Sequence, residues 1–227
     1  MDTATWTAAV GVSRDGRVLA EAAERETRSH TVSLPALVER VLADAGGRIE
    51  EVEGLAVSIG PGSFTGLRIG LALAKGLAFA GGLPLVGVPT LEALALVADA
   101  APGEVVCAAL DARKHEVYAA CFRRGAGDDA LARLGPDRVL RPEALAAELP
   151  SPCVLVGDAA EVYRDAFAGR AALRPFATYH PRGGVVARLG ARRLAAGEGT
   201  DPGPLEPVYV RPPEAELARA APRALVN

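Results

Sequence analysis

A glycine-rich turn is the part of this sequence whose residue types could bind an anion. Gly60-Pro-Gly-Ser-Phe-Thr-Gly66 follows a short apolar run and precedes a long apolar stretch. In that arrangement the free N–H groups at the start of a helix can hold a phosphate. However, the glycine spacing does not fit G-x-G-x-x-G, and the sequence contains no G-x-x-x-x-G-K-[ST]. Ser63 is not flanked as in G-x-S-x-G either. By its spacing alone, the turn is more typical of a structural turn than of a nucleotide site or a serine nucleophile.

The histidines could bind a metal ion, but they are far apart and form no H-x-x-x-H or H-E-x-x-H pair: His30, His115 and His180. A metal site needs clustered ligands. A single histidine near an expected helix start, as at position 30, is more typical of a capping or surface residue. We therefore expect no metal and no cofactor.

Composition and charge narrow the class of protein further. The 227 residues suffice for one large or two small domains, and half of them are hydrophobic. The net charge of −3 argues against a protein that binds nucleic acid by itself, because such a domain usually has a basic face. The three cysteines form no C-x-x-C pair and are typical of buried free thiols in a reducing compartment: Cys107, Cys121 and Cys153.

No signal peptide opens the sequence. The longest apolar region, residues 67–88, is interrupted by Arg68, Lys75, several glycines and Pro84. We therefore expect a cytoplasmic protein without a membrane span.

The elements around the glycine-rich turn are a strand and a helix. Leu55, Val57 and Ile59 alternate as in a strand, and Ser63 or Thr65 is expected to cap a helix over 64–80. The apolar residues of that helix point in nearly every direction, and its only charges are Arg68 and Lys75, seven residues apart. A helix that is apolar all round must be buried on more than one side. One side can be covered by the sheet, and the other requires a partner or another part of the chain.

The rest of the chain reads as alternating strands and helices. A helix ending near Ala45 has one apolar face and is stopped by Gly46-Gly47. Thr90 is a plausible cap for a helix to about Ala98. The remaining expected elements are strands over 7–12, 18–23, 83–88, 105–110, 117–122, 154–157 and 207–211, a polar loop over 123–138, and helices over 142–149, 162–167 and 185–196. This order favours mixed sheets with helices on their faces.

The glycine-rich turn and its helix also resemble a known family. Gly60-Pro-Gly-Ser-Phe-Thr-Gly-Leu-Arg-Ile-Gly70 with Ala74-Lys-Gly-Leu-Ala78 is similar to the hallmark of the TsaB (YeaZ) family, the accessory subunit for making threonylcarbamoyladenosine in tRNA. Asp111-Ala-Arg113, Glu116-Val-Tyr118 and Pro207-Val-Tyr-Val-Arg211 extend the resemblance over most of the chain. The motif residues are Gly60, Pro61, Gly62, Ser63, Phe64, Thr65, Gly66 and Arg68.

The resemblance implies a degenerate, two-lobed α/β fold of the actin-like and sugar-kinase-like (ASKHA) ATPase class. We expect an N-terminal lobe over 1–100 that carries the partner-binding helices, a smaller lobe over 101–211 and a flexible tail over 212–227. In the family an apolar strand precedes the segment that matches Asp2-Thr-Ala-Thr5 and lies in the middle of the sheet, whereas this sequence starts at that segment.

An actin-like ATPase needs an acidic residue and a glycine turn at each of two phosphate loops. The resemblance puts Asp2 in the first loop, where Ala4 replaces the glycine that active members usually carry, and Asp111 near the second. We therefore expect at most a vestigial nucleotide site at these two carboxylates. TsaD, the catalytic relative, carries a metal-binding histidine pair that this chain lacks, which implies a non-catalytic subunit.

The resemblance also implies partners. In the family two helices pack on the equivalent pair of TsaD, or on a second copy in its absence, and TsaE, an ATPase, is a further partner. TsaD transfers threonylcarbamoyl to the adenosine next to the anticodon of ANN-decoding tRNAs, so tRNA is expected only through the complex. The expected interface residues are Leu34, Leu37, Val41, Phe64, Leu67, Arg68, Leu71 and Lys75, and Leu71→Glu is expected to break the complex.

Three alternatives remain open from the residues. Both helices could simply bury against their own sheet. The chain could be an enzyme, either a small actin-fold phosphotransferase or a glycoprotease-type peptidase, or it could be a homodimeric regulator without an enzyme partner.

Overall fold

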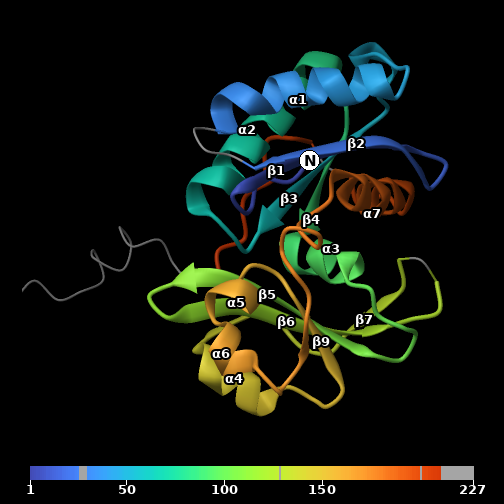
Figure 1. Ribbon diagram of the computed structural model, residues 1–227. Helices are drawn as coiled ribbons and strands as arrows, with labels where there is room; N and C mark the ends of the chain where they lie inside the picture. Colours follow the sequence, from blue (N-terminus) through green and yellow to red (C-terminus); the bar gives the residue numbers. More distant parts are fainter. Residues whose placement is uncertain (26–29, 128, 200, 211–227) are drawn as a thin grey trace, which may run out of the picture.

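The computed structural model describes residues 1–25, 30–127, 129–199 and 201–210, without the side chains of 30–32. The expected tail over 212–227 and the side chain of His30 lie outside the described residues. Within them the chain forms a two-lobed α/β structure with mixed sheets and flanking helices, as expected (Figure 1).

The first lobe begins with an antiparallel hairpin whose turn contains Asp15 and Gly16, both with positive φ. A parallel pair of strands follows, joined by the long apolar helix. These elements confirm the expected hairpin, helices and strands of this region. In chain order they are β1 (Thr7–Arg14), β2 (Arg17–Arg25), α1 (His30–Asp44), the 3₁₀ turn η1 (Ile49–Glu51), β3 (Leu55–Gly60), α2 (Phe64–Gly81) and β4 (Leu85–Pro89).

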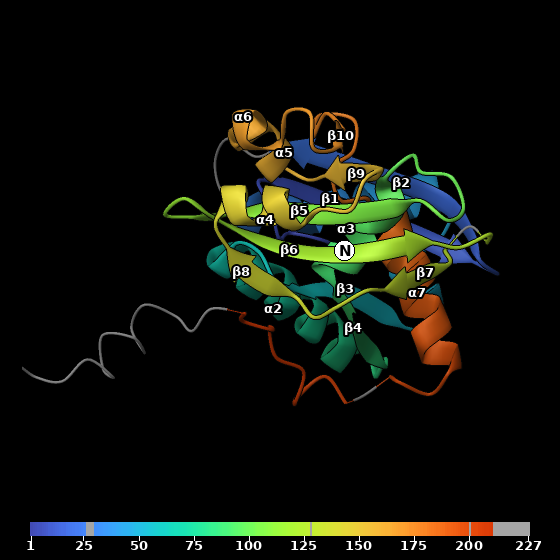
Figure 2. The same cartoon turned by 90° about the horizontal axis from the view of Figure 1, so that it is seen from below.

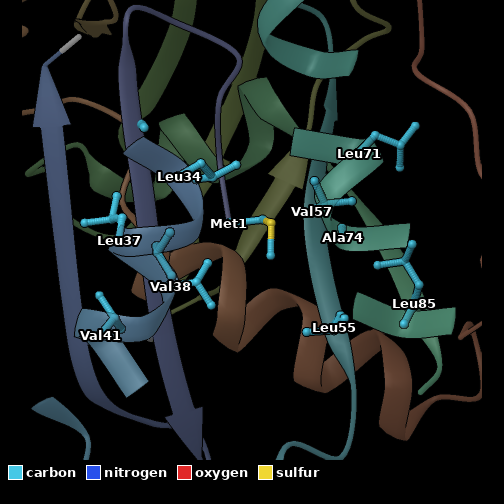
Figure 3. Close-up of a cluster of buried hydrophobic side chains, with 13 residues drawn as sticks. Met1, Leu34, Leu37, Val38, Val41, Leu55, Val57, Leu71, Ala74 and Leu85 are labelled. Atoms are coloured by element: carbon cyan, nitrogen blue, oxygen red, sulfur yellow. The ribbon is translucent and has the colours of Figure 1, made fainter. Parts of the chain in front are cut away.

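The first two residues join the halves of this lobe. The Met1 amino group donates to the Ala56 carbonyl at 2.8 Å, and the Ser58 N–H donates to the Met1 carbonyl at 3.0 Å. Asp2 forms an antiparallel bridge with Ala9 of β1. Figure 3 shows the Met1 side chain between the apolar side chains of α1 and those of β3 and α2. The start of the described chain therefore links β1 to β3 and fills the core between them.

The second lobe is one mixed sheet in the order β10-β9-β5-β6-β7, with β8 also paired to β6. The central strands β5 and β6 form the expected hairpin, and β9 runs parallel to β5. One face of the sheet packs on α4, α5 and α6 and the other on α3. The helix α3 (Thr90–Val97) lies between the lobes, because it also packs on β3 and β4 of the first lobe. The elements of the second lobe are β5 (Val105–Arg113), β6 (Glu116–Arg124), β7 (Leu131–Arg133), β8 (Arg138–Leu140), α4 (Pro142–Glu148), β9 (Cys153–Val156), α5 (Ala159–Val162), α6 (Arg164–Phe167) and β10 (Ala172–Leu173).

Two local predictions in this part of the chain are wrong. The region 123–138 is not only loop, because it contains β7 and the start of β8, which pair with β6 through their backbones. Thr90 does not cap α3. It is the first residue of the helix, and its hydroxyl accepts a hydrogen bond from the Gly60 N–H at 3.1 Å. The Thr90 contact joins residues 30 positions apart, whereas β7 pairs with the neighbouring strand β6 through backbone groups alone.

The chain then returns to the first lobe. The last helix of the described residues, α7 (Gly183–Ala195), packs on β1, β2, β3 and β4 and ends before Gly197, as expected (Figure 1). A Cβ on Gly11 of β1 would lie 2.3 Å from the Gly184 nitrogen. The backbones of β1 and α7 are therefore in direct contact at glycines, where a side chain would not fit. The prediction that 101–211 form one lobe is therefore wrong, since α7 belongs to the packing of the first lobe.

The final described segment, 201–210, also lies on the first lobe (Figure 2). The strand expected over 207–211 does not form within 207–210. The Val208 N–H donates to the Ile59 carbonyl at 2.7 Å, whereas Pro207 has no N–H to continue a ladder. We call residues 201–210 the strap, because they cross α2.

The hallmark glycines allow α2 to approach the first residues closely. A Cβ on Gly66 would lie 2.0 Å from the Thr3 carbonyl oxygen, and one on Gly62 would lie 2.5 Å from the Ala4 carbonyl oxygen. The Thr3 hydroxyl donates to the Gly66 carbonyl at 2.7 Å. Ser63 caps the helix as expected, since its Oγ accepts from the Gly66 N–H at 3.2 Å. The glycine spacing of the motif is therefore explained by packing.

In the second lobe a buried carboxylate joins β5 to the turn after β9. Asp158 Oδ1 accepts a hydrogen bond from the Asp111 N–H at 2.8 Å. Burial raises the pKa of the Asp158 carboxyl to about 6, and the nearby Asp111 carboxylate also raises it.

We predict that Gly66→Ala destabilises the protein by about 1–3 kcal/mol, because the added methyl group overlaps the Thr3 carbonyl. Gly76→Ala in the same helix is the matched control. A Cβ there meets nothing within 4 Å, so this change should stabilise by about 0.5–1 kcal/mol. Urea unfolding of both variants measures the two effects, and equal midpoints would contradict the packing explanation.

We also predict a pH dependence of stability from Asp158. Its folded pKa of about 6 lies above the value of 3.8 for an unperturbed aspartate. The folded state therefore holds the proton more tightly, and the unfolding free energy falls as pH rises from 4 to 6. Relative to Asp158→Asn, the wild type should lose about 2 kcal/mol of stability between pH 4.5 and pH 7.

Urea unfolding at both pH values tests this, with the exposed Asp165→Asn as the control. If Asp158→Asn left the pH dependence of stability unchanged, the buried carboxyl would not be its source.

Candidate functional site

Most of the expected interface side chains lie inside the protein. The structure buries five of them in the core of the chain itself, with exposed fractions between 0% and 6%: Leu34, Leu37, Val41, Leu67 and Leu71. Figure 3 shows the α1 leucines and valines and the Leu71 side chain within the same core. The prediction that these side chains face a partner is therefore wrong. Leu71→Glu would put a charge into the core and would not report on a surface.

The remaining three expected interface residues hold the strap. The Arg68 Nε donates to the Tyr209 hydroxyl at 3.1 Å, and its guanidinium lies 3.9 Å from the Phe64 ring centre. The Phe64 and Tyr209 rings are 5.3 Å apart, and the Lys75 ammonium donates to the Gly203 carbonyl at 2.8 Å. The only charges of α2 thus face its own chain. Their spacing of seven in the sequence is a partial signal of this arrangement, since it places Arg68 and Lys75 on one stripe of the helix.

An apolar strip remains exposed on the outer side of α2. Phe79 is 63% exposed and Phe64 is 42% exposed, while Ala72 and Gly76 are exposed between them. We define the outer strip as the exposed residues Thr65, Ala72, Gly76 and Phe79 together with the half-buried Ile69 and Leu73, which also pack against the core. These residues follow helical spacing and carry no charge. Within the described residues, Ala72, Gly76 and Phe79 of this strip are exposed.

A groove runs beside the outer strip, between α1 and α2. It has a volume of about 550 Å³ and is lined from α1 by Leu34 and Pro35. From α2 it is lined by Phe64, Thr65, Arg68, Ile69, Ala72 and Leu73. The helix pair therefore offers a continuous apolar surface that is hollowed along its middle.

The helix α2 is also long and apolar enough to cross a membrane, judged by length and composition alone. Its inner stripe is packed in the protein core through Leu67, Leu71, Ala74 and Ala78. The core helix of a globular protein meets the same criterion, so this property does not assign a membrane span.

A second cavity, of about 560 Å³, lies between the lobes. It is lined by residues 4–6, by 62–66 with Ile69 at the start of α2, and by 110–113, Tyr118 and Asp158. Asp111 lines this cavity and is already engaged, since its Oδ1 accepts from the Tyr163 hydroxyl at 2.8 Å and its Oδ2 pairs with Arg113 at 3.2 Å.

Asp2, the other carboxylate of the expected vestigial nucleotide site, is fully buried and does not line the cavity. Its Oδ1 accepts from the Ala4 N–H at 3.1 Å. The structure therefore does not bring Asp2 and Asp111 into one cavity. At the start of α2 the Gly66 N–H, which could have faced an anion, donates to Ser63 instead.

In the described part of the chain, no group of three or more histidine, cysteine, aspartate or glutamate side chains could hold a metal ion. The His115 ring contacts Glu143 Oε1 at 2.8 Å, and the His180 ring contacts the Pro181 carbonyl at 2.9 Å. These two histidines therefore make local contacts, and they are not close to one another in the way a metal site requires.

Comparisons with known proteins agree with the sequence motifs. Residues 17–168 match the family described as "TsaD: tRNA N6-adenosine threonylcarbamoyltransferase". The chain is 42% identical over 125 residues to the tRNA threonylcarbamoyladenosine biosynthesis protein TsaB of Escherichia coli, covering 55% of this chain and 54% of that one. The match thus spans about half the length of that relative.

Two further matches cover nearly the whole chain. The TsaB of Bacillus subtilis is 29% identical over 223 residues, covering 95% of this chain and 94% of that one. The solved structure of YeaZ from Pseudomonas aeruginosa is 32% identical, covers 92% of this chain and 96% of that one, and superposes with a TM-score of 0.79. This chain, with its hallmark turn and its mixed α/β lobes, belongs to the TsaB (YeaZ) family.

Proposed function

We propose that this chain is an accessory subunit in the synthesis of threonylcarbamoyladenosine in tRNA, and that it binds a TsaD-type threonylcarbamoyltransferase. The observation that carries the proposal is the uncharged outer strip, exposed at Ala72, Gly76 and Phe79, on a helix whose inner stripe is packed in the core. The names of the relatives support the pathway, since they are called tRNA threonylcarbamoyladenosine biosynthesis proteins.

The chemistry of the α1–α2 surface fits a protein partner. Depletion of charge at the centre and polar groups at the rim are typical of interfaces. Here Ala72, Gly76 and Phe79 form an uncharged centre, while Arg68 and Lys75 lie on the flank and bind the strap. A partner helix of similar shape would gain about 25 cal/mol for each Å² of apolar surface removed from water.

We propose that the same surface pairs with a second copy when TsaD is absent. A two-fold interface uses one patch on both subunits, so no further surface is required. The TsaD complex and the homodimer would then exclude each other.

We further propose that the chain does not catalyse the transfer itself and that TsaD positions the threonylcarbamoyl donor and the tRNA. The engaged Asp111 and the buried Asp2 support this division of roles. TsaE is proposed as a further partner and the cytoplasm as the location. The net charge of −3 supports contact with tRNA through the complex alone.

The cavity between the lobes favours a second candidate, a phosphotransferase of the actin-like class. Titration calorimetry of the full chain with magnesium-ATP separates the two functions. We expect binding weaker than about 1 mM, or no measurable heat, because the two carboxylates do not share the cavity. Submillimolar binding accompanied by phosphoryl transfer would support the enzyme instead.

We predict that Ala72→Glu weakens binding to TsaD by more than about tenfold, equivalent to about 1.4 kcal/mol. The added carboxylate would have to be desolvated in the centre of an apolar interface. Ala72 is exposed, so the unfolding free energy should stay within about 0.5 kcal/mol of the wild type.

Val162→Glu on α5 is the matched control, because Val162 is 48% exposed and lies in the second lobe. Calorimetric titration of each variant with purified TsaD, together with urea unfolding, gives both quantities. Unchanged affinity of Ala72→Glu for TsaD would reject the outer strip as the interface.

A further inference from the structure

The three cysteines, which the proposed function does not use, gather in the sheet of the second lobe. Cys107 on β5 lies directly opposite Cys121 on β6 in the antiparallel register. Cys153 on β9 lies opposite Val105, two residues from Cys107 along β5. All three thiols are free, and they pack within the same apolar cluster beneath α4, α5 and α6.

The register brings Cys107 and Cys121 within reach of a disulfide. The Leu134 N–H donates to the Cys121 carbonyl, so the backbone of Cys121 bonds to the side away from β5. The pair is therefore one without mutual hydrogen bonds, for which the Cα atoms are about 4.5 Å apart. Disulfides require a Cα separation of about 4.4–6.8 Å. Cys153 is only diagonal to Cys107, because its direct partner across the parallel β5–β9 pair is Val105.

The two thiols differ in access. Cys107 is fully buried, whereas Cys121 is half-buried and lines a cavity of about 220 Å³. Arg138 and Glu148 line the same cavity and form an ion pair at 2.6 Å. A small oxidant in this cavity would therefore meet Cys121 before Cys107.

The local electrostatics also favour reaction at Cys121 before Cys107. The hydrogen bond from Cys107 lowers the pKa of the Cys121 thiol, and the positive charge of Arg138 lowers it further. The same contact and burial raise the pKa of the Cys107 thiol. Because the thiolate is the reactive form, Cys121 is the nucleophile of the pair.

We propose that Cys107 and Cys121 form an oxidation-sensitive pair, which closes to a disulfide when a hydroperoxide reacts at Cys121. The Cys121 thiolate attacks one peroxide oxygen, the O–O bond breaks, and Cys121 becomes a sulfenic acid while the other oxygen leaves as water or an alcohol. The Cys107 sulfur then attacks the Cys121 sulfur. The S–S bond forms, the S–O bond breaks, and hydroxide leaves with the Cys107 proton as water. Two thiols lose two electrons, which reduce the peroxide.

The test uses the purified full chain treated with hydrogen peroxide at neutral pH. The count of free thiols in denaturant should fall from three to one, since a disulfide consumes two of the three cysteines. Trypsin separates the cysteines, because Arg113 and Lys114 lie between the first two and Arg138 lies between the last two. Mass spectrometry without reduction should then show one linked pair of peptides, containing Cys107 and Cys121.

Two variants sharpen the assignment. Cys153→Ser should leave the linked pair and its rate of formation unchanged. Cys107→Ala should stop the linkage and leave Cys121 as a sulfenic acid that dimedone traps, as thiolate character predicts. The wild-type peptide map decides the proposal even if a variant fails to fold. A linkage through Cys153, a linkage only between chains, or three thiols that survive peroxide would overturn it.

Discussion

The close approach of α2 to the first residues of the chain is the contact on which the arrangement of the first lobe depends. The glycines of the hallmark turn let the helix lie against the Thr3 and Ala4 carbonyls, where any side chain would overlap backbone atoms. That approach fixes which stripe of the helix enters the core. Leu67, Leu71 and Ala74 turn inward, and the opposite stripe must face outward. The exposed outer strip is thus a consequence of how the inner stripe is held.

The same contact uses backbone groups of the turn that an anion would otherwise meet. The N–H group of Gly66 is used by the Ser63 cap, and the adjacent carbonyl accepts from the Thr3 hydroxyl. The Thr3 and Ala4 carbonyls lie against the glycines of the turn, and residues 62–66 also line the cavity between the lobes. Across the cavity Asp111 is held by Tyr163 and Arg113. The cavity between the lobes is therefore present, but the two carboxylates expected to bind a nucleotide are not free in it. Asp111 is hydrogen-bonded to Tyr163, and Asp2 is buried.

Local patterns predicted the strands and helices well wherever the signal lay within a few residues. The alternation of Leu55, Val57 and Ile59 gave β3, and the cap at Ser63 gave the start of α2. Two predictions failed where the partner was distant in sequence. The Thr90 hydroxyl accepts from the Gly60 N–H and does not cap α3. The short strand β7 was missed for another reason, since it pairs with the neighbouring strand β6 through backbone groups alone. The helix α7 packs on the first lobe, where Gly183 and Gly184 lie against Gly11 of β1. No local sequence pattern predicts this contact.

The sequence by itself determined the family, the order of the elements and the existence of a helix too apolar for one buried face. These follow from residue types and spacing along the chain. Only the tertiary structure decided which apolar residues are core and which are surface, because burial depends on what the chain places against each side of the helix. The leucines expected at an interface are in the core, while Ala72, Gly76 and Phe79 are exposed. The facing thiols of Cys107 and Cys121 also required the register of β5 and β6, since the two cysteines are 14 positions apart in the sequence.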